Sequence, residues 1–140
     1  MKIIIDTNIA LDVLLNRKEF LQSSHHILKL SAQDKITGFF TTNTITDMFY
    51  VLYKNSKDAL KSKQAITELI KLIKLESVIP MDISLALASN ITDFEDAVIC
   101  FVAKRIKVDY IVTRNAMDFK NSPVPAITPS DFIDRFYFHT

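Results

Sequence analysis

The sequence predicts an α/β protein with a central, mainly parallel β-sheet of about five short strands and helices on both faces. Short runs of β-branched or aromatic residues alternate with longer segments whose apolar residues recur every three or four positions. The runs are typical of strands and the longer segments of amphipathic helices, and their alternation favours a parallel sheet. With one glycine and four prolines, no flexible linker divides the chain. We therefore expect one domain spanning residues 1–140.

The expected strands are short and are separated by longer segments. They are Ile3–Ile5, Gly38–Thr41, Ser77–Pro80, Tyr110–Thr113 and Pro125–Ile127. Each of these runs is too short for a helix. The expected helices keep the three- and four-residue spacing, and they are Ile9–Leu15, Phe20–Leu30, Ile45–Tyr53, Ala59–Leu75 and Asp96–Ile106.

Two patterns mark the start of a helix. Thr92 and Glu95 have the spacing of a capping box, and Asp93 is an alternative cap for the same helix. Thr128 followed by Pro129 combines a capping hydroxyl with a first-turn proline. This second pattern predicts a final helix near the end of the chain.

Composition excludes several classes of protein. The 17 Lys and Arg residues nearly balance 16 Asp and Glu residues, so no overall charge points to a nucleic-acid or membrane partner. The single cysteine, Cys100, excludes an internal disulfide and lies among apolar residues, where we expect a buried side chain. No run approaches the ~18 apolar residues of a membrane span, and the N-terminus lacks a signal-peptide pattern. We expect a cytoplasmic protein without a membrane partner.

Three acidic residues far apart in the sequence lie at the edges of apolar segments. Asp6 follows the first expected strand, Asp47 opens an apolar run, and Asp96 begins an expected helix. Ligands of parallel α/β sheets bind beyond the carboxyl ends of the strands, where converging carboxylates repel one another unless a cation is bound. Mg²⁺ and Mn²⁺ prefer such oxygen ligands. The pattern therefore predicts a Mg²⁺ or Mn²⁺ site and, with it, phosphodiester hydrolysis.

Each of these acids also has a simpler explanation. An acid such as Asp6, Asp47 or Asp96, taken alone, is more often a helix cap or a solvated surface charge than a metal ligand. Asp93 is three positions before Asp96, which places both in the first turn of one helix, where the helix dipole favours negative charge.

An ordered set of motifs spans the chain: Ile5-Asp6-Thr7-Asn8, Asp93-Phe94-Glu95-Asp96-Ala97, Ile111-Val112-Thr113-Arg114-Asn115, Asp118-Phe119, and the closing segments Ser122–Pro125 and Thr128–Phe132. Together they resemble PIN-domain ribonucleases, and most of all the branch of bacterial VapC-type toxins. The resemblance implies a PIN-like three-layer α/β/α sandwich. It also implies a metal-dependent endoribonuclease that hydrolyses RNA phosphodiester bonds with Mg²⁺ or Mn²⁺.

The resemblance assigns a catalytic set by position. Asp6 matches the first acid of the family, Asp96 the third, and Asp47 the second, which is often Glu. The fourth acid commonly stands two residues after Thr113, where this chain has Asn115. An amide accepts hydrogen bonds and metal contacts through its carbonyl but carries no charge, so we expect weaker binding of a second ion than of the first.

Neighbouring residues complete the expected site. Asp118 is either a compensating acid or a turn residue before a core aromatic. Thr7, Asn8 and Thr113 are candidates to orient ligands or water, and Arg114 to contact a phosphate; capping of the adjoining helix or turn explains each equally well.

The resemblance also implies partners, namely an RNA substrate, a homodimer and, for a toxin, a cognate antitoxin whose segment covers the acidic pocket. Two alternatives stay open. Because of Asn115, the chain is alternatively a weak or inactive PIN-like module that binds RNA or a protein. A phosphotransferase of the haloacid dehalogenase type also places an Asp after its first strand, but it needs an acid where Asn8 stands.

Overall fold

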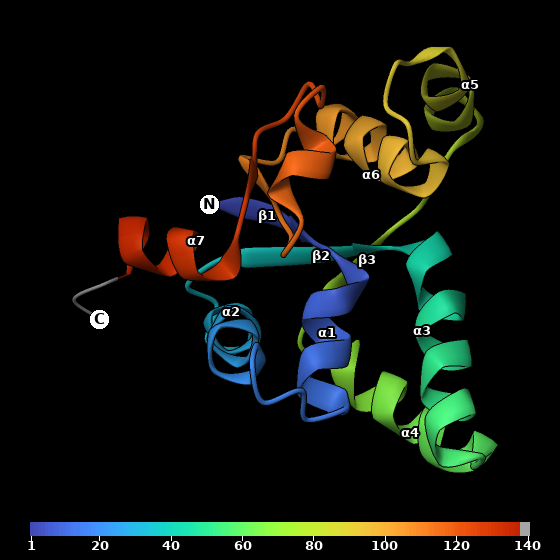
Figure 1. The fold of residues 1–140 in the computed structure, drawn as a ribbon, viewed down its shortest axis with the longest axis vertical. Coiled ribbons are helices and arrows are strands. Elements are labelled where there is room, and N and C mark those ends of the chain that lie inside the picture. Colours follow the sequence, from blue (N-terminus) through green and yellow to red (C-terminus); the bar gives the residue numbers. More distant parts are fainter. Residues whose placement is uncertain (138–140) are drawn as a thin grey trace.

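The computed structural model describes residues 1–137 and shows a parallel five-stranded sheet between two layers of helices (Figure 1). The strands are β1 (Lys2–Ile5), β2 (Thr37–Thr41), β3 (Lys74–Glu76), β4 (Tyr110–Val112) and β5 (Ala126–Ile127). Their order in the sheet is β3-β2-β1-β4-β5, and every neighbouring pair is parallel. The predicted α/β/α sandwich is confirmed; the last three positions of the expected domain lie outside the described residues.

The helices divide between the two faces of the sheet. They are α1 (Thr7–Leu14), α2 (Leu21–Ala32), α3 (Thr42–Ser56), α4 (Ala59–Leu69), α5 (Pro80–Ala88), α6 (Phe94–Arg105), the 3₁₀ helix η1 (Ala116–Phe119) and α7 (Pro129–Phe136). Figure 1 shows α1 to α4 on one side of the sheet and α5, α6 and η1 on the other. Within residues 1–137 no helix is long and apolar enough to cross a bilayer.

Alternation along β1 builds a separate core on each face. Ile3 and Ile5 belong to the cluster beneath α1 to α4, which also contains the fully buried Phe40. Ile4 points to the opposite face and packs in the cluster of α6, where Cys100 is fully buried as predicted. Successive side chains of a strand point to opposite faces, so one central strand anchors both layers.

The predicted bounds of one helix and one strand between residues 59 and 80 were wrong. The helix expected to reach Leu75 ends at Leu69, and the strand expected at Ser77–Pro80 lies instead at Lys74–Glu76. This strand pairs only with β2 at the sheet edge and is largely exposed, so it carries no apolar signature. Helix α5 was not predicted: Pro80 occupies its first turn, where proline is favoured.

Helix starts also correct the sequence expectations. Asp93, rather than Thr92, caps α6 by accepting a 2.9 Å hydrogen bond from the Asp96 amide. Thr128 caps α7 as predicted, with 3.2 Å between its hydroxyl and the Asp131 amide. Helix α3 begins at Thr42, ahead of the expected start at Ile45, and Asp47 lies inside the helix, so it is not a cap.

Candidate active site

A candidate active-site pocket lies at the carboxyl ends of β1 and β4. The chain leaves β1 toward β2 on one side of the sheet, whereas β4 pairs with β1 on the other, so a crevice opens between β1 and β4. The cavity there measures about 460 Å³, and its walls are formed by Asp6, Thr7, Asn8, Leu11, Asp47, Tyr50, Val51, Asp93, Glu95, Asp96, Asn115, Asp118 and Phe119. Most of the predicted site residues therefore lie around one cavity.

Asp6 is held in place by both neighbouring strands. Its backbone amide donates to the Val112 carbonyl over 3.0 Å, which extends the β1–β4 pairing to the carboxyl end of β1. Its carboxylate accepts a 2.8 Å hydrogen bond from the Thr113 hydroxyl. Thr113 is itself fixed because its amide donates to the Ile127 carbonyl of β5 over 3.0 Å. The sheet thus sets the orientation of the Asp6 carboxylate.

Burial and neighbouring groups act on the charge of Asp6 in opposite directions. Burial is the larger influence and raises the pKa of Asp6 above its usual range. The hydrogen bond from Thr113 and the positive charge of Arg114 lower this pKa, whereas the charge of Asp12 raises it. Asp6 is thus poised for a cation that would stabilise its ionised form.

The first turn of α6 contributes a second set of carboxylates to the pocket. Burial and the charges of Asp93, Asp6 and Asp118 raise the pKa of Asp96 to about 7. Asp93, the cap of this helix, also lines the pocket. Burial is the larger cause of this shift, and the three neighbouring carboxylates add to it.

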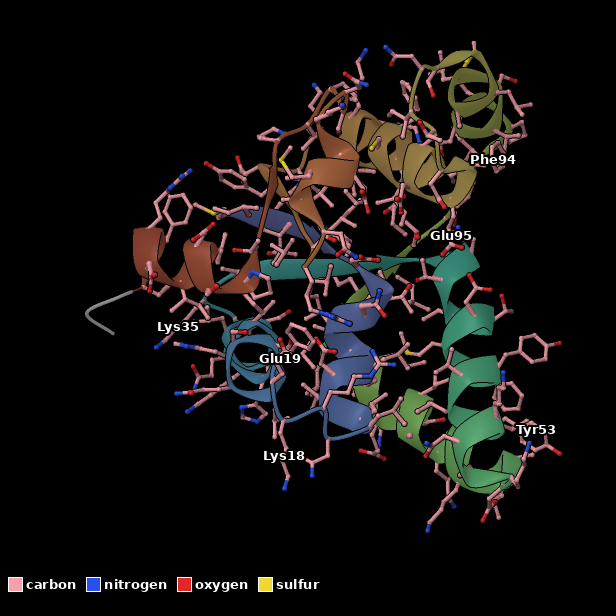
Figure 2. The ribbon with its side chains drawn as sticks, viewed as in Figure 1. Lys18, Glu19, Lys35, Tyr53, Phe94 and Glu95 are labelled. Carbon is pink, nitrogen blue, oxygen red and sulfur yellow. The ribbon has the colours of Figure 1, made fainter. Side chains whose placement is uncertain are left out.

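Glu95 is a pocket residue that was not predicted as a site residue from the sequence. Burial, followed by a hydrogen bond and charge repulsion from Asp47, raises its pKa to about 7. Figure 2 shows Glu95 between the start of α6 and the near end of α3, from which Asp47 comes. Three acids within four positions at the start of a helix, Asp93, Glu95 and Asp96, were the signal available in the sequence.

Asp118 reaches the pocket from η1, and Asn115 reaches it from the position directly before this helix. The backbone amide of Asn115 donates to the Thr113 hydroxyl over 3.2 Å, and the exposed side chain of Asn115 lines the pocket. Asp118 lines the same pocket, and its charge contributes to the raised pKa of Asp96. Asn115 and Asp118 therefore lie at the same pocket as Asp6 and Asp96.

The remaining predicted residues differ in their surroundings. Thr7 is buried beside the pocket, and its hydroxyl has no hydrogen-bond partner within residues 1–137. Asn8 lines the pocket and accepts from Arg17 over 3.4 Å. Arg114 is not among the pocket-lining residues; its Nε lies 3.1 Å from a carboxylate oxygen of Asp12.

Comparison with known proteins identifies the family. The PIN domain family model matches residues 2–117, which include Asp6, Asp47, Asp96 and Asn115. The chain belongs to the PIN domain family. This result confirms the resemblance drawn from the motifs and removes the haloacid dehalogenase alternative. No curated protein sequence matches the chain.

Solved structures share the fold of this PIN domain at low sequence identity. VapBC2 from Rickettsia felis bound to a promoter DNA fragment contains a chain with 17% identity and a TM-score of 0.68, covering 91% of this chain and 98% of that one. For DNA-bound VapBC from Salmonella typhimurium the identity is 14% and the TM-score 0.70, and the match covers 92% of this chain and 98% of that one. For a toxin–antitoxin complex from Klebsiella pneumoniae the identity is 19% and the TM-score 0.67, and the match covers 90% of this chain and 96% of that one. In each comparison the shared fold thus covers nearly the full length of both chains.

The donor set of this PIN domain suits a hard divalent cation. The acids that surround the pocket offer carboxylate oxygens, and burial together with neighbouring carboxylates raises the pKa values of Asp6, Glu95 and Asp96. As the side chains stand, no three His, Cys, Asp or Glu residues within 1–137 close around a single ion position. Side-chain movements are therefore needed for several of these carboxylates to share one ion.

Proposed function

We propose that this PIN domain is a metal-dependent endoribonuclease that hydrolyses RNA phosphodiester bonds in the cytoplasm as a single domain spanning residues 1–140. The observation that carries the proposal is the convergence of Asp6, Asp47, Glu95 and Asp96 on one cavity although they come from three separate segments of the chain. Their mutual repulsion favours a bound cation. No other described feature combines a cavity with so direct a chemical use.

Under this proposal Asp6 and Asp96 are the principal ligands of Mg²⁺ or Mn²⁺, with Asp47 as the third. An ion of this kind polarises the phosphodiester and lowers the pKa of the attacking water. Thr113 orients the Asp6 carboxylate, and the cap formed by Asp93 fixes the first turn from which Asp96 projects. Glu95, hydrogen-bonded to Asp47, is a further candidate ligand or proton acceptor.

The test is cleavage of mixed structured and unstructured RNAs by purified protein with Mn²⁺, with Mg²⁺ and with EDTA. We expect metal-dependent cleavage that falls about 10³-fold or more in an Asp6→Asn/Asp96→Asn double variant, because a catalytic metal contributes several kcal/mol. Asp58→Asn is the matched control, since it replaces a surface acid that caps α4, and asparagine caps helices equally well. Cleavage that survives EDTA and the double substitution would rule out this proposal.

A partner protein belongs to the same proposal. The similar structures include VapBC and toxin–antitoxin complexes, and this supports a toxin with a cognate antitoxin as its partner. We propose in addition that the antitoxin covers the pocket and that the toxin acts as a homodimer. Expression in bacteria tests the toxin assignment: growth arrest that disappears in the Asp6→Asn/Asp96→Asn variant is expected. Light scattering of the purified protein tests the dimer.

One observation favours a second function. Asn115 stands at the pocket edge where the family commonly has an acid, and an amide does not replace the missing charge. A catalytically weak module that binds RNA or a protein without cleaving it is therefore the alternative. RNA binding without cleavage at saturating Mn²⁺ would favour this module over the nuclease.

A further inference from the structure

Asp12 is a fully buried carboxylate that the proposed metal site does not use. Its side chain is 0% exposed on α1, and acids are rarely buried this completely unless they are paired. Oδ2 accepts a 2.8 Å hydrogen bond from the Ser24 hydroxyl, and Oδ1 lies 3.4 Å from Nη1 of Arg17. Nε of Arg114 lies 3.1 Å from Oδ2 and forms an ion pair with it, although its N–H is not aligned for a hydrogen bond. One buried acid therefore holds two arginines.

Arg114 is held from a second direction by an aromatic ring. Its guanidinium carbon lies 3.9 Å from the centroid of the Phe20 ring, within the range of a cation–π contact. The Asp12 carboxylate meets one edge of the guanidinium and the Phe20 ring covers one face. Within residues 1–137 no hydrogen bond uses Nε or either terminal nitrogen of Arg114, and the side chain is 20% exposed. Part of a cation that is positioned by an ion pair and an aromatic ring therefore remains available to a ligand.

This cation stands next to the acidic pocket. Arg114 follows Thr113, which donates to Asp6, and precedes Asn115, which lines the pocket. Its charge reaches Asp6, whose pKa it lowers. The pocket wall itself contains no Lys or Arg among the described residues, so a phosphate entering it meets negative charge only. A guanidinium presents paired N–H donors that match phosphate oxygens.

We propose that Asp12 is a positioning residue that holds Arg114 at the rim of the pocket, where Arg114 binds a phosphate group of the RNA substrate. The inference rests on the proposed ribonuclease function. Asp12 carries one negative charge against the two positive charges of Arg17 and Arg114, so the cluster keeps a net positive charge for the ligand. Phe20 restricts the guanidinium plane and lowers the entropy lost on binding.

The decisive variant is Asp12→Asn, because a charge effect and a positioning effect predict opposite changes in RNA affinity. Removal of a negative charge near RNA strengthens binding if only overall charge matters. Release of Arg114 from its position weakens binding if Asp12 acts as proposed. We measure the affinity of a single-stranded RNA oligonucleotide in EDTA, which prevents metal-dependent cleavage, and kcat/KM with Mn²⁺. We expect both to fall, with kcat/KM reduced about 10-fold or more, in the range typical of residues that orient a functional group.

A double-mutant cycle separates positioning from a general structural effect. Arg114→Gln removes the phosphate contact and is expected to reduce the slope of log affinity against log salt by about 0.7, the value for one phosphate of a single strand. If Asp12 acts through Arg114, adding Asp12→Asn to Arg114→Gln causes no further loss of kcat/KM. If Asp12 only stabilises the fold, the losses of the two substitutions multiply.

The chain offers a matched control in Asp82. Its carboxylate is 1% exposed and is bound by Arg105, with Nη2 at 3.0 Å and Nε at 3.1 Å, between α5 and α6 and outside the pocket. Asp82→Asn is expected to lower stability without changing RNA affinity or kcat/KM. If Asp12→Asn does not fold, Phe20→Leu replaces it in the cycle, because leucine keeps the packing but removes the cation–π contact.

The outcomes separate the two proposals. Wild-type protein that neither binds nor cleaves RNA would end the ribonuclease proposal and, with it, this inference. Wild-type protein that cleaves, together with an Asp12→Asn variant that binds RNA as tightly as wild type or more tightly, would overturn the inference alone. Multiplying losses in the cycle would do the same. Weaker binding in Asp12→Asn and no further loss beyond Arg114→Gln would establish it.

Discussion

The Thr113 hydroxyl donates a 2.8 Å hydrogen bond to the Asp6 carboxylate and thereby joins the ends of β4 and β1, 107 positions apart in the chain. The same hydroxyl accepts from the Asn115 amide over 3.2 Å, so its hydrogen is directed toward Asp6. A hydrogen bond to a carboxylate favours the ionised form. Thr113 therefore keeps Asp6 both oriented and more acidic than burial alone would leave it.

Replacement of this hydroxyl by a methyl group, Thr113→Val, should weaken Mn²⁺ binding and cleavage by about 10–100-fold, as for other residues that orient metal ligands. The pKa of Asp6 should also rise, because the interaction that lowers it is lost. Calorimetric titration with Mn²⁺ and a pH–rate profile measure the two effects. Thr113→Ser, which keeps a hydroxyl, is the control and should stay near wild type. Equal metal affinity in all three proteins would contradict this role.

Stability of the metal-free protein should fall as pH rises. Burial and neighbouring acids raise the pKa of Asp96 from 3.8 to about 7, and burial and Asp47 raise that of Glu95 from 4.5 to about 7. Between about pH 4 and pH 7 the folded protein therefore binds protons that the unfolded chain has released, and the free energy of unfolding decreases with pH. Above about pH 7 both carboxyl groups are ionised in the folded protein, and their effect on the free energy of unfolding no longer changes with pH.

Urea denaturation at pH 5 and pH 8, with EDTA or with Mn²⁺, checks the pH dependence. We expect lower stability at pH 8 in EDTA and a gain on adding Mn²⁺, since an ion that binds only the folded state stabilises it. Asp96→Asn should be more stable than wild type at pH 8 in EDTA, because it removes part of the repulsion. An Asp96→Asn variant with the same pH dependence as wild type would show that Asp96 is not the group responsible.

Introduction of the missing acid should strengthen the site. Asn115→Asp adds a carboxylate at the pocket edge and is expected to lower the Mn²⁺ concentration needed for half-maximal cleavage, because each added anionic oxygen ligand favours a hard cation. In EDTA the same change should raise the pKa of Asp96 further by adding negative charge. Cleavage assays over a range of Mn²⁺ concentrations measure the shift. Asn55→Asp, an exposed position in the last turn of α3 and outside this pocket, is the matched control and should leave the Mn²⁺ dependence unchanged.

Gly38 marks a close approach between β2 and α2. A β-carbon there would lie 2.9 Å from both Cδ1 of Ile5 and the Ser31 hydroxyl oxygen. The Gly38 amide also donates to that hydroxyl over 3.3 Å. Gly38→Ala should therefore destabilise the protein by about 1–3 kcal/mol, as overpacking in a core does. Thermal denaturation measures the loss; a variant as stable as wild type would show that Ile5 and Ser31 can move aside.

Local patterns predicted most of the sheet and one part of the site. Ile3 to Ile5 and Tyr110 to Val112 were recognisable because central strands are buried on both faces and consist of apolar residues. Strand β3 was misplaced because an exposed edge strand needs only backbone pairing with β2 and leaves no apolar pattern. Asp6 and Asn115 were predicted as site residues because they follow the ends of β1 and β4, where parallel sheets bind ligands, and both line the pocket.

The sequence by itself determined the α/β alternation, the central strand and the acids Asp6 and Asp96, because these depend on apolar periodicity and on positions next to one element. Only the tertiary structure decided that Glu95 meets Asp47 and that Asp12 holds Arg114. These pairs join residues from different helices and loops, whose distances depend on how the layers pack. No local pattern encodes such contacts, since periodicity records which face of an element is buried but not which element lies against it.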